Sequence, residues 1–237
     1  MKEIHEYRIY RYDWPSRLEH LNRWPGYKTE IDGLDSNFLH IRSSYPNAVP
    51  LVLTHGWPGS VLEFQKAIGP LTDPADFGAD DGIALRLVIP TLPGFRYSHK
   101  PTEAGWNIER IASAWDELMM RLGYDQYYAQ GGDWGAIVTA AIGAEKKGHC
   151  QGIHMNMPIA PPDPDQMDDL TELEQRAPSA LQFYQWMDCN GHPENILSRD
   201  ELLDNVMLIG FPMQLLHLQE SIGNALGPQE LPLSRYP

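Results

Sequence analysis

The chain has 237 residues, of which 42% are hydrophobic, 10% aromatic and 21% charged. This composition is typical of a folded globular protein and excludes disordered and collagen-like classes. The net charge of −14 argues against nucleic acid and anionic membrane surfaces as partners, because both bind basic patches. We expect no membrane span, since no apolar run approaches about 20 residues, and no signal peptide. The only cysteines, Cys150 and Cys189, cannot form a disulfide framework, so a cytoplasmic protein with reduced thiols is expected.

Short strands and helices alternate through the first two thirds of the chain. Two strands are predicted around the turn signal Asp32-Gly33, at Tyr27–Glu30 and Asn37–Ile41. Four further apolar runs are typical of buried strands: Val49–Thr54, Ala84–Ile89, Tyr127–Gln130 and Gly152–Met155. Helices are predicted between them, at Ser60–Ile68, 108–122 and Trp134–Lys147. This alternation predicts an α/β fold with a mostly parallel sheet, whose ligands bind at the carboxyl ends of the strands.

The last third of the chain differs in composition. Residues 161–237 hold 3 basic and 13 acidic residues, and no lysine follows Lys147. A proline-rich break at 158–164 leads into this segment. We expect an exposed acidic helix at 165–176 and a second helix at 200–208.

The strongest motif is Gly131-Gly132-Asp133-Trp134-Gly135, which follows a predicted strand and opens a predicted helix. This is the context of a nucleophile elbow, in which the central residue sits on a sharp turn between strand and helix. A carboxylate at that position attacks electrophilic sp³ carbon, as in an epoxide or an alkyl halide, and becomes an ester. No G-x-S-x-G occurs, which weakens a serine esterase interpretation. The alternative is a Gly-rich turn whose aspartate caps the following helix.

Two other loops follow predicted strands. His55-Gly56-Trp57-Pro58-Gly59-Ser60 stands where an α/β-hydrolase contributes a backbone amide to its oxyanion hole. The amides of Trp57 and Trp134 would then form that hole. The alternative is a strand-to-helix turn that uses Gly and Pro for its geometry. Pro90–Phe95 is expected to be a loop without a catalytic role.

Together these motifs resemble the epoxide hydrolases of the α/β-hydrolase superfamily, of the microsomal and juvenile-hormone type with an N-terminal meander. The resemblance extends from about Tyr12 to Pro158. The matching stretches are Tyr12–Trp14, Ile31–Leu34, His55–Phe64, Leu122–Tyr124, Ala129–Gly135 and Gly152–Pro158. Haloalkane dehalogenases share the aspartate elbow, but they usually carry Asn at the position of Trp57. The resemblance therefore favours an epoxide over a halide as substrate.

The resemblance implies that Asp133 opens a small-molecule epoxide to an ester, which water then hydrolyses. It implies no cofactor and no metal. In the family a His activates the water, a Glu or Asp orients that His, and two Tyr residues of a cap domain polarise the epoxide oxygen. The sequence offers no match for these groups. The histidines after Asp133 do not stand at the position or in the sequence context of the family's His; they are His149, His154, His192 and His217. Tyr184 matches one cap Tyr only poorly.

We therefore expect an α/β-hydrolase fold that is incomplete at its C-terminal end. Its parts would be a meander at 1–50, a core with the elbow at 51–158, and a remnant cap with an irregular tail at 159–237. The expected function is an epoxide hydrolase impaired by the absence of a recognisable base. One alternative is an active enzyme that uses His217 with Glu220, or a second chain, for hydrolysis. Another is a non-catalytic protein that forms homo-oligomers through an exposed sheet edge.

Overall fold

The computed structural model describes residues 2–79, 83–95, 98–145, 147–158, 171, 200 and 229–230. The chain divides into two compact units, residues 1–12 with 159–204 and residues 13–158 with 205–237. In the first unit, helix α1 (Lys2–Tyr10) is described, and the Tyr7 hydroxyl donates to Asp200 Oδ1 at 2.8 Å. The second unit holds the sheet and the candidate site.

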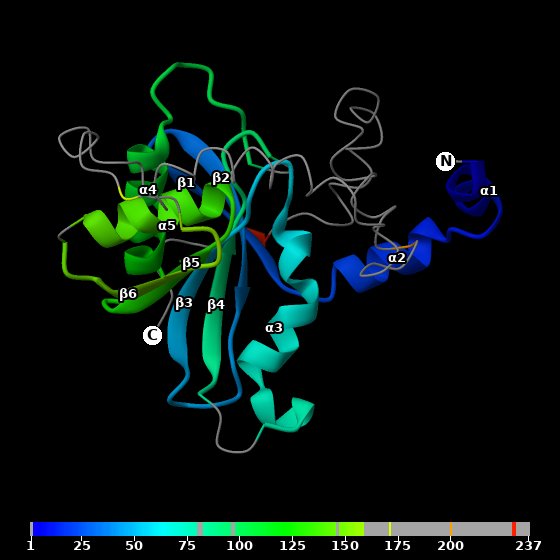
Figure 1. Cartoon of the computed structure of the whole chain (residues 1–237), viewed down its shortest axis with the longest axis horizontal. Coiled ribbons are helices and arrows are strands. Elements are labelled where there is room, and N and C mark those ends of the chain that lie inside the picture. Colours follow the sequence, from blue (N-terminus) through cyan, green and yellow to red (C-terminus); the bar gives the residue numbers. More distant parts are fainter. Residues whose placement is uncertain are drawn as a thin grey trace. The chain divides into compact units, whose positions relative to one another are not determined.

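The described residues of the second unit form one mixed, mostly parallel sheet of seven strands (Figure 1). The strands are β1 (Gly26–Ile31), β2 (Leu34–Ile41), β3 (Val49–Thr54), β4 (Leu85–Pro90), β5 (Tyr127–Gly131), β6 (Cys150–Met155) and β7 (Gln229–Glu230). Their order is β6-β5-β3-β4-β2-β1-β7. Strands β3 to β6 run parallel to one another, whereas β2 runs antiparallel to β1 and β4. The predicted parallel α/β sheet is confirmed.

The hairpin between β1 and β2 has the predicted turn. Asp32 and Gly33 both adopt positive φ angles, 52° and 75°, and Ile31 pairs with Leu34 on either side. Two such residues in succession form the type I′ turn that suits the twist of a two-residue hairpin. The Asp32 carboxylate also accepts a hydrogen bond of 2.6 Å from Arg110 Nε, which joins the turn to the helix at Ile108–Arg121.

The helices of the second unit agree with the sequence in part. They are α2 (Trp14–Leu21), α3 (Gln65–Thr72), α4 (Ile108–Arg121) and α5 (Trp134–Ala144), with 3₁₀ turns η1 (Val61–Phe64) and η2 (Pro74–Phe77). Helices α1 and α2 were not expected, and the helix expected from Ser60 begins as the 3₁₀ turn η1. Helix α5 ends before Lys147, because Gly148 turns the chain at a φ of 81° and Lys147 pairs with Glu145 at 2.8 Å.

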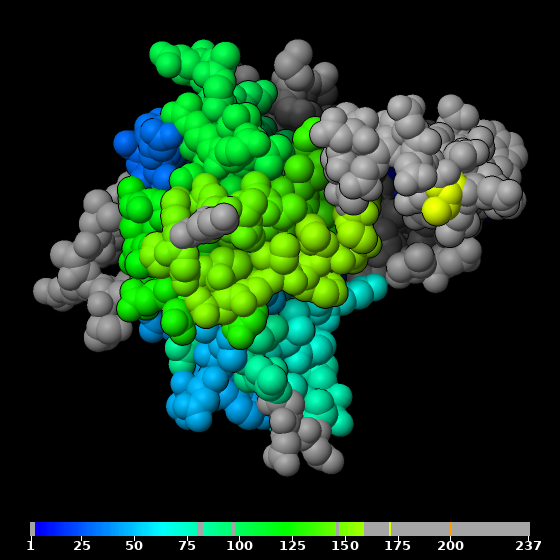
Figure 2. Space-filling view, turned by 60° about the vertical axis from the view of Figure 1, so that its left-hand side comes forward, coloured from blue at the N-terminus to red at the C-terminus, as the bar shows by residue number. Residues whose placement is uncertain are grey.

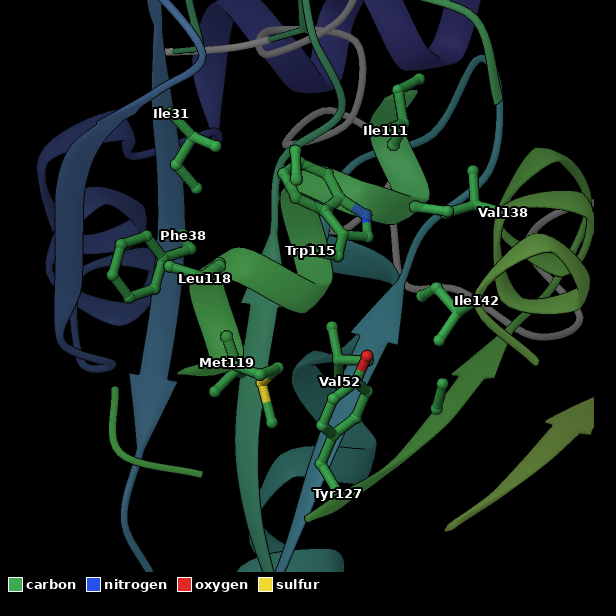
Figure 3. Close-up of a cluster of buried hydrophobic side chains, with 14 of the residues drawn as sticks. Ile31, Phe38, Val52, Ile111, Trp115, Leu118, Met119, Tyr127, Val138 and Ile142 are labelled. Atoms are coloured by element: carbon green, nitrogen blue, oxygen red, sulfur yellow. The ribbon is translucent and has the colours of Figure 1, made fainter. Parts of the chain in front are cut away.

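Helices cover both faces of the sheet. Successive strand residues point to opposite faces, so Val52 packs into one core while Leu51 and Leu53 pack into another. The first core lies between the sheet and helices α4 and α5, with Trp115 and Met119 fully buried in it (Figure 3). The second core includes Ile68 of α3. On the face seen in Figure 2, the green to yellow-green residues of α4, α5 and β6 form one continuous surface.

A polar cluster lies at the start of β5. Asp116 of α4 is 6% exposed, and its Oδ1 accepts a hydrogen bond from the Tyr127 hydroxyl at 2.8 Å. His149 Nδ1 lies 3.0 Å from the same oxygen, and Lys147 Nζ lies 3.4 Å from Oδ2. Burial and the neighbouring Asp116 together raise the pKa of the Tyr127 hydroxyl far above its ordinary value. This cluster therefore ties α4, β5 and the loop before β6 together.

Several predicted features lie outside the described residues: the helix at 165–176, the helix at 200–208 apart from Asp200, and the side chains Tyr184, Cys189, His192, His217 and Glu220. Among the residues that the structure does describe, no helix is long and apolar enough to span a membrane. The same part of the chain contains no cluster of three or more side chains that could hold a metal ion, and Cys150 is a free thiol.

Candidate active site

Asp133 stands between β5 and α5 in a strained backbone conformation. Its φ and ψ angles are 53° and −128°, a region that residues with a side chain rarely occupy. Such a conformation costs on the order of 1–3 kcal/mol and is found mostly at functional sites. The strand-to-helix turn predicted from the sequence is therefore present, with Asp133 at its tip.

The sharp turn depends on close backbone contacts at two glycines. A Cβ atom on Gly131 would collide with the carbonyl group of Gly135, on the far side of the turn. A Cβ atom on Gly135 would collide with the carbonyl group of Thr54, at the end of the neighbouring strand β3. Only glycine allows the backbone to approach this closely, which explains why the motif places a small residue two positions before and two after Asp133.

The Asp133 side chain does not cap helix α5. It makes no capping hydrogen bond, and its Oδ1 instead accepts a hydrogen bond of 2.7 Å from the backbone N–H of Trp57. Helix α4 provides the contrast, because its N-cap residue Asn107 accepts from the Arg110 backbone N–H at 3.0 Å. The alternative interpretation of Asp133 as a helix cap is thus wrong, and its carboxylate faces the loop after β3.

The loop after β3 is fixed from beneath by His55, which is fully buried. Its Nδ1 donates to the Gly56 carbonyl oxygen at 2.8 Å, and its Nε2 accepts from the Leu92 backbone N–H at 3.1 Å. Those two bonds use the neutral ring with its proton on Nδ1. Gly56 lies so close to Asp133 that an added Cβ would come within 2.5 Å of the Asp133 Cβ. His55 therefore shapes the loop and is not available as a base.

Two tryptophans flank the Asp133 carboxylate. Trp57 carries the amide that binds it; the residue is 62% exposed, and the peptide bond that joins it to Pro58 is cis. Trp134 is the first residue of α5, with a side chain that is 47% exposed. Both predicted amide donors are therefore next to Asp133: Trp57 through a hydrogen bond and Trp134 as the following residue. That the two amides stabilise an oxyanion remains a prediction.

The described histidines after Asp133 lie at opposite ends of β6: His149 precedes the strand, and His154 lies near its last residue. His149 contacts Asp116 at the start of β5, the end of the strand away from the elbow. His154 is exposed on β6, where it pairs in register with Gln130. Both were interpreted from sequence as ordinary histidines, and His149 has a structural partner.

Glu63 is a site residue that the sequence analysis missed. It lies in η1, and its carboxylate accepts from the Ser60 backbone N–H at 3.1 Å in a capping box. Partial burial raises the pKa of the Glu63 carboxyl, the amides of Gly56 and Ser60 lower it, and the charge of Asp133 raises it. The signal was present, because a serine followed three residues later by glutamate is the signature of that box.

Comparisons with known proteins agree with this geometry. The family model described as "alpha/beta hydrolase fold" matches residues 49–236, and the model described as "Epoxide hydrolase N terminus" matches residues 1–64. The putative epoxide hydrolase of Stigmatella aurantiaca is 43% identical over a match that covers 86% of this chain and 55% of that protein. Epoxide hydrolase 1 of Oryctolagus cuniculus is 38% identical, covering 67% of this chain and 36% of the relative.

Solved structures give the same result. The juvenile hormone epoxide hydrolase of the silkworm Bombyx mori has a TM-score of 0.69 at 28% identity, covering 87% of this chain and 62% of that one. The Aspergillus niger epoxide hydrolase has a TM-score of 0.63 at 26% identity, covering 95% and 63%. This chain spans about half the length of the curated relatives that it matches. The chain belongs to the α/β-hydrolase fold family, and it is similar to the epoxide hydrolases within that family.

Proposed function

We propose that the chain opens a small-molecule epoxide by forming an ester on Asp133, as the first half of epoxide hydrolysis. One observation carries this proposal: the Asp133 carboxylate is held at a strained elbow with Oδ1 on the Trp57 amide, 2.7 Å away. Binding one oxygen in this way leaves the other free to attack. The similarity to named epoxide hydrolases supports an epoxide as the electrophile.

In the first step, the free oxygen of Asp133 attacks an epoxide carbon. A new carbon–oxygen bond forms, the ring carbon–oxygen bond breaks, and the released alkoxide takes a proton from a donor or from water. The Trp57 amide keeps the carboxylate oriented during this displacement.

In the second step, water attacks the ester carbon of Asp133. Negative charge then develops on the carbonyl oxygen, which is the atom that backbone amides in an oxyanion hole stabilise. We assign this role to the amides of Trp57 and Trp134. Collapse of the intermediate expels the diol and restores the carboxylate. Because the sequence shows no residue in the place of the family's base, we expect this step to be slow.

The test is to incubate the purified chain with excess styrene oxide, followed by intact mass measurement and peptide mapping. We expect one adduct per chain, located on Asp133, and slow release of diol. Asp133→Asn is the matched control, since the amide keeps the size of the side chain but is a poor nucleophile; it should form no adduct. A wild-type chain that stays unlabelled would contradict the proposal.

Two further measurements distinguish the proposed function from a full epoxide hydrolase and from a dehalogenase. Rapid release of diol by the wild type would contradict a slow second step and support a full hydrolase. A primary alkyl bromide tests the dehalogenase alternative; we expect it to label Asp133 far more slowly than the epoxide does. Equal labelling by both electrophiles would remove the preference for an epoxide.

A further inference from the structure

The bond between Trp57 and Asp133 requires the loop at 55–60 to be held in one position. Gly56 lies so close to the Asp133 carboxylate that a Cβ atom added to it would stand 2.7 Å from Oδ1 and 2.9 Å from Cγ, which is too close for any side chain. A shift of about 1 Å would therefore either cause a clash or break the hydrogen bond, and a displacement of that size can cost about 100-fold in rate.

One side of this loop is fixed by His55, which binds the Gly56 carbonyl and the Leu92 amide. A tight turn follows, in which the Gly59 N–H donates to the Gly56 carbonyl oxygen at 3.1 Å. These bonds hold the Gly56 carbonyl group and the Gly59 N–H. They do not involve the N–H groups of Gly56, Trp57 and Ser60, and the Trp57 N–H is the one that binds Asp133.

The Glu63 carboxylate accepts from one of those N–H groups, that of Ser60, at 3.1 Å. A hydrogen bond from the Gly56 backbone amide also lowers the pKa of Glu63. The carboxylate lies directly over Gly59, where an added Cβ would collide with the Glu63 carboxyl oxygen. Glu63 thus spans the loop from Gly56 to Ser60.

The two carboxylates also interact through space. Partial burial is the largest cause of the raised pKa of Glu63, and the negative charge of Asp133 adds to it. An electrostatic effect of this kind requires the two groups to be near each other. The two carboxylates bind the same loop, Glu63 through the Ser60 amide and Asp133 through the Trp57 amide.

We propose that Glu63 is a positioning residue for ester formation: its carboxylate holds the loop at 56–60 so that the Trp57 amide stays on Asp133 Oδ1. This rests on the proposed function for its kinetic consequence. Glu63 forms no bond with the substrate in this mechanism; it acts through the loop backbone.

The kinetic test measures the maximal rate of ester formation with styrene oxide by mass spectrometry. We expect Glu63→Ala to lower that rate about tenfold while the concentration dependence changes little, because orientation and not substrate binding is lost. Glu63→Gln should stay within about threefold of wild type, since its amide oxygen can still accept from Ser60. Ser60→Ala is the matched control, because its hydroxyl caps the same 3₁₀ turn through the Leu62 N–H at 3.3 Å.

A second readout does not depend on any reaction. Hydrogen exchange of the Trp57 backbone amide, followed by NMR, should be about tenfold faster in Glu63→Ala than in wild type or Ser60→Ala. Asp133→Ala gives the rate of the released amide. If Glu63→Ala matches Ser60→Ala in both measurements, Glu63 is only a helix cap and the proposal is wrong. If the wild type forms no adduct, the proposed function fails, and the exchange comparison alone decides the role of Glu63.

Discussion

The two ends of strand β5 differ in how their polar side chains are bonded. At its start, Tyr127 is buried and donates to Asp116, which also contacts His149 and Lys147. Just beyond its last residue, Asp133 adopts a strained backbone conformation and its carboxylate accepts a hydrogen bond from the Trp57 backbone amide. The sequence separation between Tyr127 and Asp133 is only six residues.

The difference shows how stability and reactivity are divided along one strand. Polar groups at the start are satisfied by partners, so they fix α4 against the sheet and are chemically inert. Asp133, the nucleophile that we propose, stands at the other end, where the surrounding sheet supports the strain of its backbone. Changes at the first end should therefore alter stability alone, whereas changes at the second should alter reactivity first.

The largest stability effect should come from Asp116→Ala. Removing the carboxylate leaves the Tyr127 hydroxyl buried without its acceptor, so the free energy of unfolding should fall by about 3–4 kcal/mol. Urea unfolding measures the change. Glu117→Ala is the matched control on the same helix, because Glu117 is exposed and its pair with Arg121 should contribute less than about 0.5 kcal/mol. If the folded Asp116→Ala protein forms the Asp133 ester more slowly than the wild type, the start of β5 affects reactivity as well as stability, and the contrast between the two ends is wrong.

A second effect should appear as a dependence of stability on pH. Burial, with the nearby Arg42 and Arg86, lowers the pKa of His40 from 6.5 to about 4, and its Nε2 lies 2.8 Å from the Tyr124 hydroxyl. Between these values the unfolded chain binds more protons than the folded one. The contribution of His40 is therefore complete above pH 6.5 and lost as the pH falls toward 4, by about 3 kcal/mol at most.

Urea unfolding at pH values from 7 to 4 measures this loss, with His40→Gln as the control. Glutamine can still bond to Tyr124 but does not titrate in this range, so its stability should depend less steeply on pH than that of the wild type. Parallel curves for the two proteins would show that His40 does not titrate as its burial implies.

The smallest effect on stability should be an increase in the free energy of unfolding. Asp133→Gly relieves the positive φ angle, so the free energy of unfolding should rise by about 1–2 kcal/mol while ester formation is lost. Asn107→Gly is the paired change at a helix N-terminus that does use its side chain as a cap, and it should lower stability by a few tenths of a kcal/mol. Thermal or urea unfolding of both variants measures the comparison. A loss of stability in Asp133→Gly would show that the elbow is not strained.

Six strands of the sheet were predictable from the sequence, whereas strand β7 and the N-terminal helices were not. The run at 49–54 is apolar and β-branched, and strand β3 has those bounds. The Asp32-Gly33 signal required a two-residue turn, which is present. Helices α1 and α2 were missed because the apolar periodicity by which a helix is recognised in a sequence gave little guidance there. Helix α1 is largely exposed and polar, and α2 begins at Trp14-Pro15. The end of α5 was placed too late because Glu145 already leaves the helical conformation, and Lys147 pairs both with Glu145 and with Asp116 of another helix.

The sequence by itself determined the elbow, because Gly131, Asp133 and Gly135 leave few other ways to join a strand to a helix. It also determined that a loop beginning His55-Gly56 should follow a neighbouring strand. Only the tertiary structure decided that the Asp133 carboxylate meets the Trp57 amide and does not cap its own helix, because that choice depends on residues 76 positions apart. The electrostatic effect of Asp133 on Glu63 and the cluster around Asp116 also appear only in the tertiary structure, since burial and charge act between segments that become neighbours only when the chain folds.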